Sequence, residues 1–316
     1  MLHARQAGEV SVKYKSQIPP GWSYNPSGFA ERWVMAVAGL AGFVVATYLA
    51  LYQLGVIARP YDPIFGSKSS IAILASPLAR LLPVPDAALG AFAYLAEVVL
   101  DLIGGRDRWC TMPWVVVLFA LVVGAFGFAS VLLLIFQPVL FNAWCTLCLV
   151  SAAISIGVAG SAMDELLAAL QHLKGRYDFK TPGPTAAAQV LPWTGTVPHL
   201  INVALGIWLI VAPDILSYSG GLSVFHRIVG SLAIGAAATA AREATRPLRW
   251  VNVGLGFLLI LSLYYIDSSP LGALDGAGVG VAMLLLAVKG KTTRYSFDGG
   301  WRVLWIRSHG SHSHEL

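Results

Sequence analysis

The sequence predicts an all-α integral membrane protein, built as a bundle of four transmembrane helices followed by two repeated transmembrane helical hairpins. Of its 316 residues, 57% are hydrophobic and only 12% are charged, whereas a soluble domain has about 25% charged residues. The mean hydropathy of +0.70 excludes a disordered chain, which would be poor in aliphatic and aromatic residues. The chain has three cysteines, too few for a secreted disulfide scaffold.

The first four spans follow a polar segment of 32 residues, in which we expect no cleavable signal peptide because four cations precede any apolar run. Residues 33–57 contain 25 positions without a charge, enough to cross a hydrocarbon core of about 30 Å. Three more apolar runs predict spans at 86–104, 114–136 and 139–163, the last continuing to near Lys174.

The second apolar region follows a predicted linker at 175–196, where Lys, Asp, Pro and Thr mix without helical periodicity. Its shorter runs predict spans at 197–212, 228–241, 250–266 and 273–288. The hexapeptide at 201–206 (INVALG) recurs at 251–256 as VNVGLG, and Val229-Gly230 recurs as Val279-Gly280. Because this period covers two helices, the copies share one orientation, which predicts a duplicated helical hairpin rather than an inverted repeat.

The distribution of cations predicts the orientation of the eight spans. With the N-terminus inside, 17 of the 21 Lys and Arg residues lie on the cytoplasmic side, as the positive-inside rule requires. Those expected outside are Arg59, Lys68, Arg80 and Arg227. Both termini are therefore expected in the cytoplasm. The cations beside the spans also account for the net charge of +5, so no nucleic-acid partner is expected.

A C-x-x-C motif, Cys145-Thr146-Leu147-Cys148, lies near the outer start of the fourth span. Cysteines at i and i+3 share one helical face, and an N-terminal position favours a thiolate, so the motif suits redox exchange. If the helix begins near Val139, Cys145 lies about 9 Å below its start, a depth that a lipid quinone ring can reach. The alternative is that both cysteines only pack as small apolar side chains.

Neither a second disulfide nor a metal site is predicted from the remaining cysteine and the histidines. Cys110 is expected at the inner end of the third span, about 35 Å from Cys145, too far for a disulfide. We interpret it as a bystander. No metal is expected, because zinc needs four ligands and no further Cys or His is predicted near the motif.

Several sequence features in chain order resemble the vitamin K epoxide reductase family. They span about 33–174 and comprise Tyr52-Gln53-Leu54-Gly55, Asp62-Pro63-Ile64-Phe65-Gly66, Pro83-Val84-Pro85-Asp86 before Leu89-Gly90, and Trp144 before the C-x-x-C motif. The resemblance implies a four-helix redox bundle around a quinone of the ubiquinone or menaquinone type, covered by a half-helix at 69–82. It also implies a bacterial-type inner (plasma) membrane.

The resemblance also implies residue roles. Cys145 would exchange with a thiol, Cys148 would face the quinone carbonyl, and Asp86 would polarise the quinone. The family's outer loop holds a cysteine pair that relays electrons from a thioredoxin-like partner or domain, but the matching positions here are Tyr61 and Ser69. Ala152 stands where some members have Tyr.

The second region resembles the SPW-repeat membrane family, through Asn202-Val203-Ala204-Leu205-Gly206-Ile207-Trp208 and its later echo. That resemblance implies no chemistry. The predicted division is therefore a cytoplasmic tail (1–32), a vitamin K epoxide reductase-like bundle (33–174), a linker (175–196), an SPW-repeat-like region (197–290) and a cytoplasmic tail (291–316).

Two further groups of polar residues are interpreted without a function. Glu97 and Asp101 lie near the cytoplasmic end of the second span, where we expect both to reach toward Arg106 or Arg108. A group of tail histidines is expected to be solvated rather than to bind a metal. Its members are His309, His312 and His314.

Together these features predict a thiol-disulfide:quinone oxidoreductase in the lipid bilayer. An external dithiol partner of the thioredoxin fold, on the outer face, would reduce the disulfide at Cys145, and Cys148 would then reduce a lipid quinone. The alternative is a noncatalytic quinone-binding or scaffold protein that lost turnover together with the loop cysteines.

Overall fold

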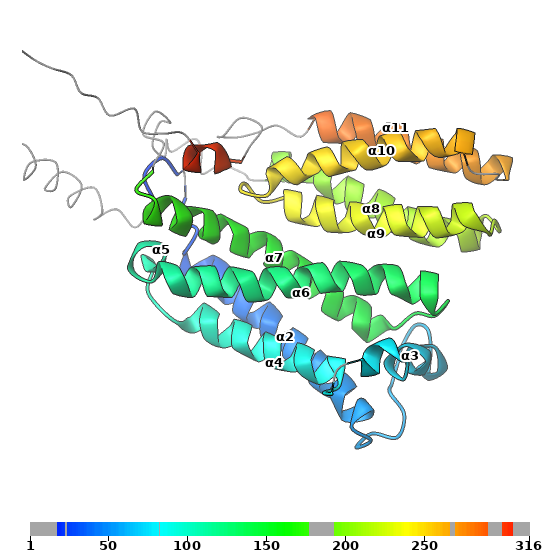
Figure 1. The fold of residues 1–316 in the computed structure, drawn as a ribbon, viewed down its shortest axis with the longest axis horizontal. Coiled ribbons are helices and arrows are strands. Elements are labelled where there is room, and N and C mark those ends of the chain that lie inside the picture. Colours follow the sequence, from blue (N-terminus) through cyan, green and yellow to red (C-terminus); the bar gives the residue numbers. More distant parts are fainter. Residues whose placement is uncertain are drawn as a thin grey trace, which may run out of the picture.

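The computed structural model describes residues 18–22, 24–81, 83–176, 193–265, 269–289 and 299–305, and they form an all-α protein (Figure 1). The long helices lie roughly parallel or antiparallel to one another, α2, α4, α6 and α7 in one group and α8 to α11 in the other. Their bounds are α2 Phe29–Gln53, α4 Asp86–Leu102, α6 Pro113–Leu140, α7 Thr146–Leu173, α8 Trp193–Ile215, α9 Gly221–Ala240, α10 Arg249–Tyr265 and α11 Pro270–Lys289. The shorter elements are α3 Ser67–Leu74, α5 Arg108–Thr111 and the 3-10 turns η1 Leu78–Arg80, η3 Arg246–Leu248 and η4 Trp301–Leu304.

Seven of the described helices are long and apolar enough to cross a membrane. The remaining long helix, α4, has 17 residues, or about 26 Å at 1.5 Å per residue, which is the lower limit for a span. It packs lengthwise against α2 (Figure 1). The chain is a multi-pass membrane protein.

The start of the fourth span differs from its predicted position. α6 continues through Pro138 to Leu140, and α7 begins only at Thr146. Proline lacks an N–H, so helices end near it, and Asn142 in the turn that follows has a φ of 44°. Cys145 is consequently the residue that caps α7 rather than a residue six positions inside a helix, and the predicted depth of 9 Å was wrong.

Other predicted boundaries also change. The span predicted at 228–241 is α9, which begins seven residues earlier at Gly221, and the span predicted at 33–57 is α2, which begins and ends four residues earlier. The half-helix expected at 69–82 is divided into α3 and η1, because α3 ends before Ser76 and Pro77 interrupts the backbone hydrogen bonding. The linker expected at 175–196 overlaps α8, which begins at Trp193. Residues 177–192 of that linker lie outside the described residues, as do the three tail histidines.

The two hairpins of the second region pack in the same way. In α8 and α9, a Cβ added at Gly206 would lie 2.7 Å from the carbonyl oxygen of Gly230. In α10 and α11, fifty residues later, a Cβ at Gly256 would lie 2.8 Å from the carbonyl oxygen of Gly280. Small residues let membrane helices approach this closely. The shared contact supports the duplication inferred from the sequence.

Parts of both predicted tails pack against the helices. The Trp22 side chain is 1% exposed, and its indole Nε1 donates to Gln171 Oε1 at 2.9 Å. Near the other terminus, Trp301 Nε1 donates to the carbonyl of Ala244 at 2.7 Å. Burying an indole with its N–H partnered stabilises such segments, so the described ends of the chain are not free tails.

Candidate active site

The C-x-x-C motif lies at the N-terminus of α7, at the end of the first bundle that we name the cysteine end. Cys145 and Cys148 form a disulfide, with their Cα atoms 5.2 Å apart. The Cys145 side chain is fully buried and Cys148 is half-buried. Cys145 packs against Ile73 of α3 and Ala143 of the preceding turn. The cysteine proposed to meet the partner is thus covered by the loop that contains α3.

Asp62 fixes that loop to the start of α7. Its carboxylate accepts the Thr146 N–H at 2.8 Å, the Thr146 hydroxyl at 2.6 Å and the Ser70 hydroxyl at 2.6 Å. It also accepts the backbone N–H groups of Ile64 and Phe65. Burial by itself would raise the pKa of Asp62, but the hydrogen bonds outweigh it and hold the pKa well below its usual value.

Ser69 lies directly beside the redox motif. Its hydroxyl accepts the Trp144 N–H at 2.8 Å and donates to the Trp144 carbonyl at 2.7 Å, one residue before Cys145. Tyr61, the other position lacking a cysteine, is 69% exposed, and its backbone N–H donates to Tyr48 Oη. The structure therefore brings only one of these two positions to the disulfide.

Two polar side chains support the turn behind Cys145. Gln137, 1% exposed at the end of α6, accepts the Cys145 N–H through Oε1 at 2.9 Å. Arg227 of α9 donates to the carbonyl of Pro138 at 3.1 Å and to Asp214 at 2.7 Å. The second helical region is thereby connected to the last turn of α6, which precedes the motif.

Asp86 contacts a residue that lines a neighbouring cavity rather than either cysteine of the disulfide. The Gln53 amide donates to Asp86 Oδ1 at 2.5 Å and to the Leu74 carbonyl at 3.1 Å. Gln53 and Leu74 line a cavity of about 510 Å³ together with Arg80 and Pro85. None of the contacts described for Asp86 joins it to either cysteine. Leu74 is next to Ile73, so α3 lies between this cavity and Cys145.

Tyr94 is a polar residue that the sequence analysis missed. Its hydroxyl lies 2.6 Å from the Ser151 carbonyl and 2.7 Å from Ser155 Oγ. Ser151 is one helical turn from Cys148, and Ala152 is its neighbour. Tyr94 therefore supplies a hydroxyl to this face of α7 from α4. The signal in the sequence that could have pointed to Tyr94 was a tyrosine within an otherwise apolar membrane span.

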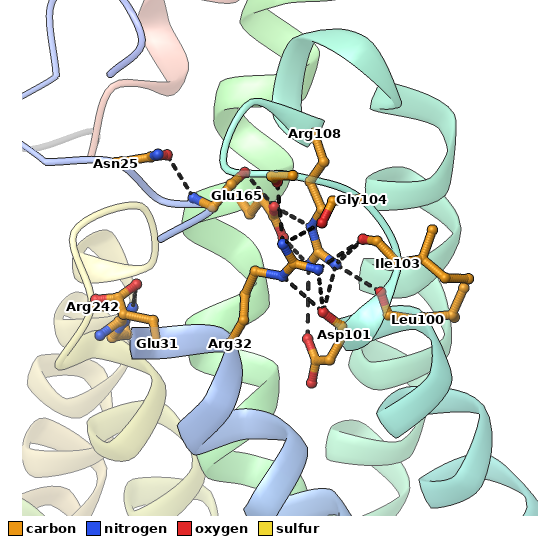
Figure 2. Close-up of polar contacts among 12 residues, drawn as sticks. Asn25, Glu31, Arg32, Leu100, Asp101, Ile103, Gly104, Arg108, Glu165 and Arg242 are labelled. Carbon is orange, nitrogen blue, oxygen red and sulfur yellow. Dashed lines mark hydrogen bonds and ion pairs between the residues drawn. The ribbon is translucent and has the colours of Figure 1, made fainter. Parts of the chain in front are cut away.

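The opposite end of the first bundle, which we name the arginine end, holds a buried ionic cluster (Figure 2). Arg108 is fully buried, and its guanidinium contacts both carboxylate oxygens of Glu165, with Nε 2.5 Å from Oε1. Arg32 donates to backbone carbonyls at the C-terminal end of α4. These contacts join α2, α4, α5 and α7.

The predicted ion pairing at this end is confirmed for one acid and wrong for the other. Asp101 Oδ1 lies 3.7 Å from Arg108 Nη2. Glu97 pairs with neither Arg106 nor Arg108. It is 4% exposed, and its Oε1 has no hydrogen-bond partner within the described ranges. A full turn before the end of α4, Glu97 points toward α2, where a Cβ at Gly39 would lie 2.9 Å from Oε1.

Cys110 lies in α5 at the arginine end, as expected, and is a free cysteine. Its Sγ donates to the Asp107 carbonyl at 3.1 Å. Burial and the nearby Asp107 raise the pKa of the Cys110 thiol, which makes it a poor nucleophile.

Comparison with known proteins identifies the first bundle. The family model described as "Vitamin K epoxide reductase family" matches residues 33–163. Residues 33–163 belong to the vitamin K epoxide reductase family. No curated protein and no solved structure matches the chain.

Membership in the vitamin K epoxide reductase family indicates quinone-related redox chemistry in a membrane. The matched range contains most of α2, all of α4 and α6, most of α7 and the loop with α3. The disulfide, Asp62 and the cavity therefore all lie within it. The match ends before α8, and the SPW-repeat resemblance of the second region stays a prediction.

Proposed function

We propose that the protein is a membrane thiol-disulfide:quinone oxidoreductase, passing electrons from an external dithiol through Cys145 and Cys148 to a lipid quinone. The observation that carries the proposal is the disulfide at the N-terminus of α7, within the family-matched region and one loop away from a cavity of about 510 Å³. Ligand cavities commonly have volumes of about 300–1,000 Å³.

We further propose that the cysteine end faces outward in a bacterial-type inner membrane. Support comes from the cations, 17 of 21 of which lie on the other side in that orientation. The dithiol partner, a protein of the thioredoxin fold, then approaches from outside, and both termini lie in the cytoplasm.

The first step is thiol-disulfide exchange. A partner thiolate attacks Cys145 Sγ, the bond between the two cysteines breaks, and Cys148 leaves as a thiolate. The backbone N–H groups of the first turn of α7 stabilise that negative charge. Because Cys145 is buried beneath α3, this step requires the loop to move, and the Ser69 contacts with Trp144 are those that must open. The partner's second thiolate then releases the oxidised partner.

The quinone is proposed to bind in the cavity that Gln53 lines, where Asp86 would polarise it through its contact with Gln53. The cavity is lined by apolar residues such as Leu74 and Pro85 together with Gln53 and Arg80, a combination that fits a ring bearing carbonyl oxygens. A bound ubiquinone or menaquinone supplies the acceptor for two electrons and two protons. Gln53, which lines the cavity, donates to the Asp86 carboxylate. The Tyr94 hydroxyl contacts Ser151, which lies one helical turn from Cys148.

The test is quinone reduction by the purified full-length protein in proteoliposomes, with reduced thioredoxin as donor and ubiquinone-1 as acceptor. Cys148→Ser should abolish reduction. In cells, the remaining Cys145 thiolate should attack the disulfide of the oxidised partner and release one partner thiolate, and the resulting mixed disulfide should be visible as a discrete adduct on a non-reducing gel. The matched control is Cys110→Ser, which should retain full activity.

The noncatalytic scaffold predicts a different result. In that case the wild-type protein reduces no quinone, and thiol labelling of Cys145 and Cys148 is the same in native membranes with and without quinone depletion. That pair of results would reject the oxidoreductase.

A further inference from the structure

A column of polar side chains runs through the apolar interior of the first bundle. Asp101, Glu97 and Tyr94 follow one another on α4 at spacings of four and three residues, so they share one helical face. Their exposed fractions are 1%, 4% and 4%. Ionisable side chains inside a membrane span cost free energy and mark functional paths by default.

Glu97, at the centre of the column, is buried and packs closely against α2. Within the described part of the chain its Oε1 has no hydrogen-bond partner, and only a glycine fits opposite it, since a Cβ at Gly39 would lie 2.9 Å away. A small cavity of about 10 Å³ is lined by both Glu97 and Tyr94, with room for about one water molecule. The α6 side chains that line this cavity, Val122, Val123 and Phe126, carry no charge.

The column extends toward the disulfide through α7. The Tyr94 hydroxyl contacts Ser155 Oγ and the Ser151 carbonyl, and Ser151 lies one turn from Cys148. Tyrosine hydroxyls and carboxyl groups can both accept and donate a proton. The groups along the column therefore suit proton transfer.

The other end of the column meets the ionic cluster of the arginine end. Figure 2 shows Asp101 beside Arg32 and Arg108 at the end of α4. Neither oxygen of its carboxylate has a hydrogen-bond partner among the described residues, and the 3.7 Å separation from Arg108 is an ion pair only. Asp101 lies one helical turn from Glu97 on the same face of α4.

We propose that this column conducts protons from the arginine end, so that quinone reduction takes its protons from the cytoplasmic side. The proposal rests on the proposed oxidoreductase function. Per turnover, one dithiol is oxidised to a disulfide and two electrons reduce one quinone to the quinol. The two thiol protons are released at the cysteine end, and the two protons of the quinol enter through Asp101, Glu97 and Tyr94.

The competing route is direct transfer of the thiol protons to the quinone at the cysteine end. That route needs no column and moves no proton across the membrane. The two routes therefore differ in the pH change on the cytoplasmic side.

The experiment uses the full-length protein in proteoliposomes with a pH-sensitive dye trapped in the lumen, and with valinomycin and potassium to dissipate the membrane potential. Reduced thioredoxin added outside reaches only molecules whose cysteine end faces outward, and ubiquinone-1 is the acceptor. We expect the lumen to lose about two protons per quinone reduced, as the balance above requires, and a protonophore to abolish the pH change.

The decisive variant is Glu97→Gln, which keeps the shape of the side chain but cannot transfer a proton. We expect it to lower the rate of quinone reduction about 100-fold, within the range for loss of a general acid, and to abolish the lumen pH change. Glu97→Asp should restore part of the rate of quinone reduction and part of the lumen pH change. The matched control is Asp107→Asn, which changes an exposed carboxylate at the same end and should leave both unchanged. Its melting temperature and that of Glu97→Gln should be no lower than that of the wild type.

The outcomes separate this proposal from the proposed function. If the wild type reduces quinone while the lumen pH stays constant and Glu97→Gln retains the full rate, the proton path is wrong and the oxidoreductase stands. If the wild type reduces no quinone and no mixed disulfide forms at Cys145, the proposed function fails and the path fails with it.

Discussion

The Asp62 carboxylate caps α7 from a loop 84 residues earlier in the chain, with Oδ2 2.8 Å from the Thr146 N–H and Oδ1 2.6 Å from the Thr146 hydroxyl. The helix that carries the disulfide is thus fixed at its first residue by the loop that covers it. Loop and disulfide form one structural unit, so loosening the cap should also change access to Cys145.

Asp62→Asn should destabilise the protein. The Asp62 carboxylate only accepts hydrogen bonds, whereas the NH₂ group of Asn would face the Ser70 and Thr146 groups that donate to it. We expect a loss of about 2 kcal/mol at pH 7, since hydrogen bonds to a charged group are worth about 1.5–3 kcal/mol. The measurement is thermal unfolding in detergent. Ser70→Ala, which removes one donor to the same carboxylate, should cost less.

The difference in stability between the wild type and Asp62→Asn should depend on pH, because the pKa of Asp62 is lowered in the folded protein. A carboxylate with a lowered pKa in the folded state stabilises the protein above its unfolded pKa of about 3.9, and that contribution is lost as the pH falls through the folded value. The gap between wild type and Asp62→Asn should therefore stay constant from neutral pH down to about pH 5 and narrow below about pH 4. A gap that already closes near pH 6 would contradict this assignment.

Ser69→Cys should restore a loop thiol in reach of the redox motif, because the Ser69 hydroxyl already contacts the Trp144 backbone on both its N–H and its carbonyl. Combined with Cys148→Ser, the introduced thiol is expected to form a disulfide with Cys145, detectable by mass spectrometry of non-reduced peptides. The same experiment with Tyr61→Cys is the control, since Tyr61 is 69% exposed. Equal cross-linking at both positions would mean that the loop does not hold Ser69 in place.

Arg108→Met should strongly destabilise the first bundle, because it leaves the Glu165 carboxylate buried without its main cationic partner. Removing one partner of a buried ion pair costs about 3–5 kcal/mol. Adding Glu165→Gln to Arg108→Met should recover part of the loss. Chemical unfolding in mixed micelles measures both variants, and a double variant less stable than Arg108→Met would show that Glu165 is stabilised mainly by other donors.

The sequence was sufficient for features that depend on neighbouring residues. The apolar runs place the long helices, the offset of fifty residues reveals the paired hairpins, and the C-x-x-C spacing predicts a pair that can form a disulfide. Features that depend on contacts between distant segments were missed. The start of α7 depends on Asp62, and the position of the Glu97 side chain depends on a glycine of α2. Neither dependence has a local signal in the sequence.

Tyr94 illustrates the same limit for the site. Its hydroxyl reaches α7 only because α2 presents Gly42, where a Cβ would lie 2.5 Å from the Tyr94 ring. In the sequence, Tyr94 is one aromatic residue in an apolar run. Recognising its contacts with Ser151 and Ser155 requires the packing of three helices.

Gly206→Ala and Gly256→Ala should have equal effects if the hairpins are structural duplicates. Each added methyl group would meet a backbone carbonyl of the partner helix, at 2.7 Å from Gly230 and 2.8 Å from Gly280. Backbone cannot yield as a flexible side chain does, and overpacking costs about 1–3 kcal/mol. We expect both variants to lower the melting temperature in detergent by similar amounts.

Gly254→Ala is the matched control, because a Cβ at Gly254 meets no atom within 4 Å and the equivalent residue of the first hairpin is already Ala204. Replacing this helical glycine should be neutral or stabilise the protein by about 0.4–1 kcal/mol, through the lower entropy of the unfolded chain. If Gly254→Ala destabilises as much as Gly256→Ala, the loss reflects general intolerance of α10 to substitution. A loss at Gly206 without a comparable loss at Gly256 would instead show that the two hairpins, although similar in sequence, do not depend on the same helix contact.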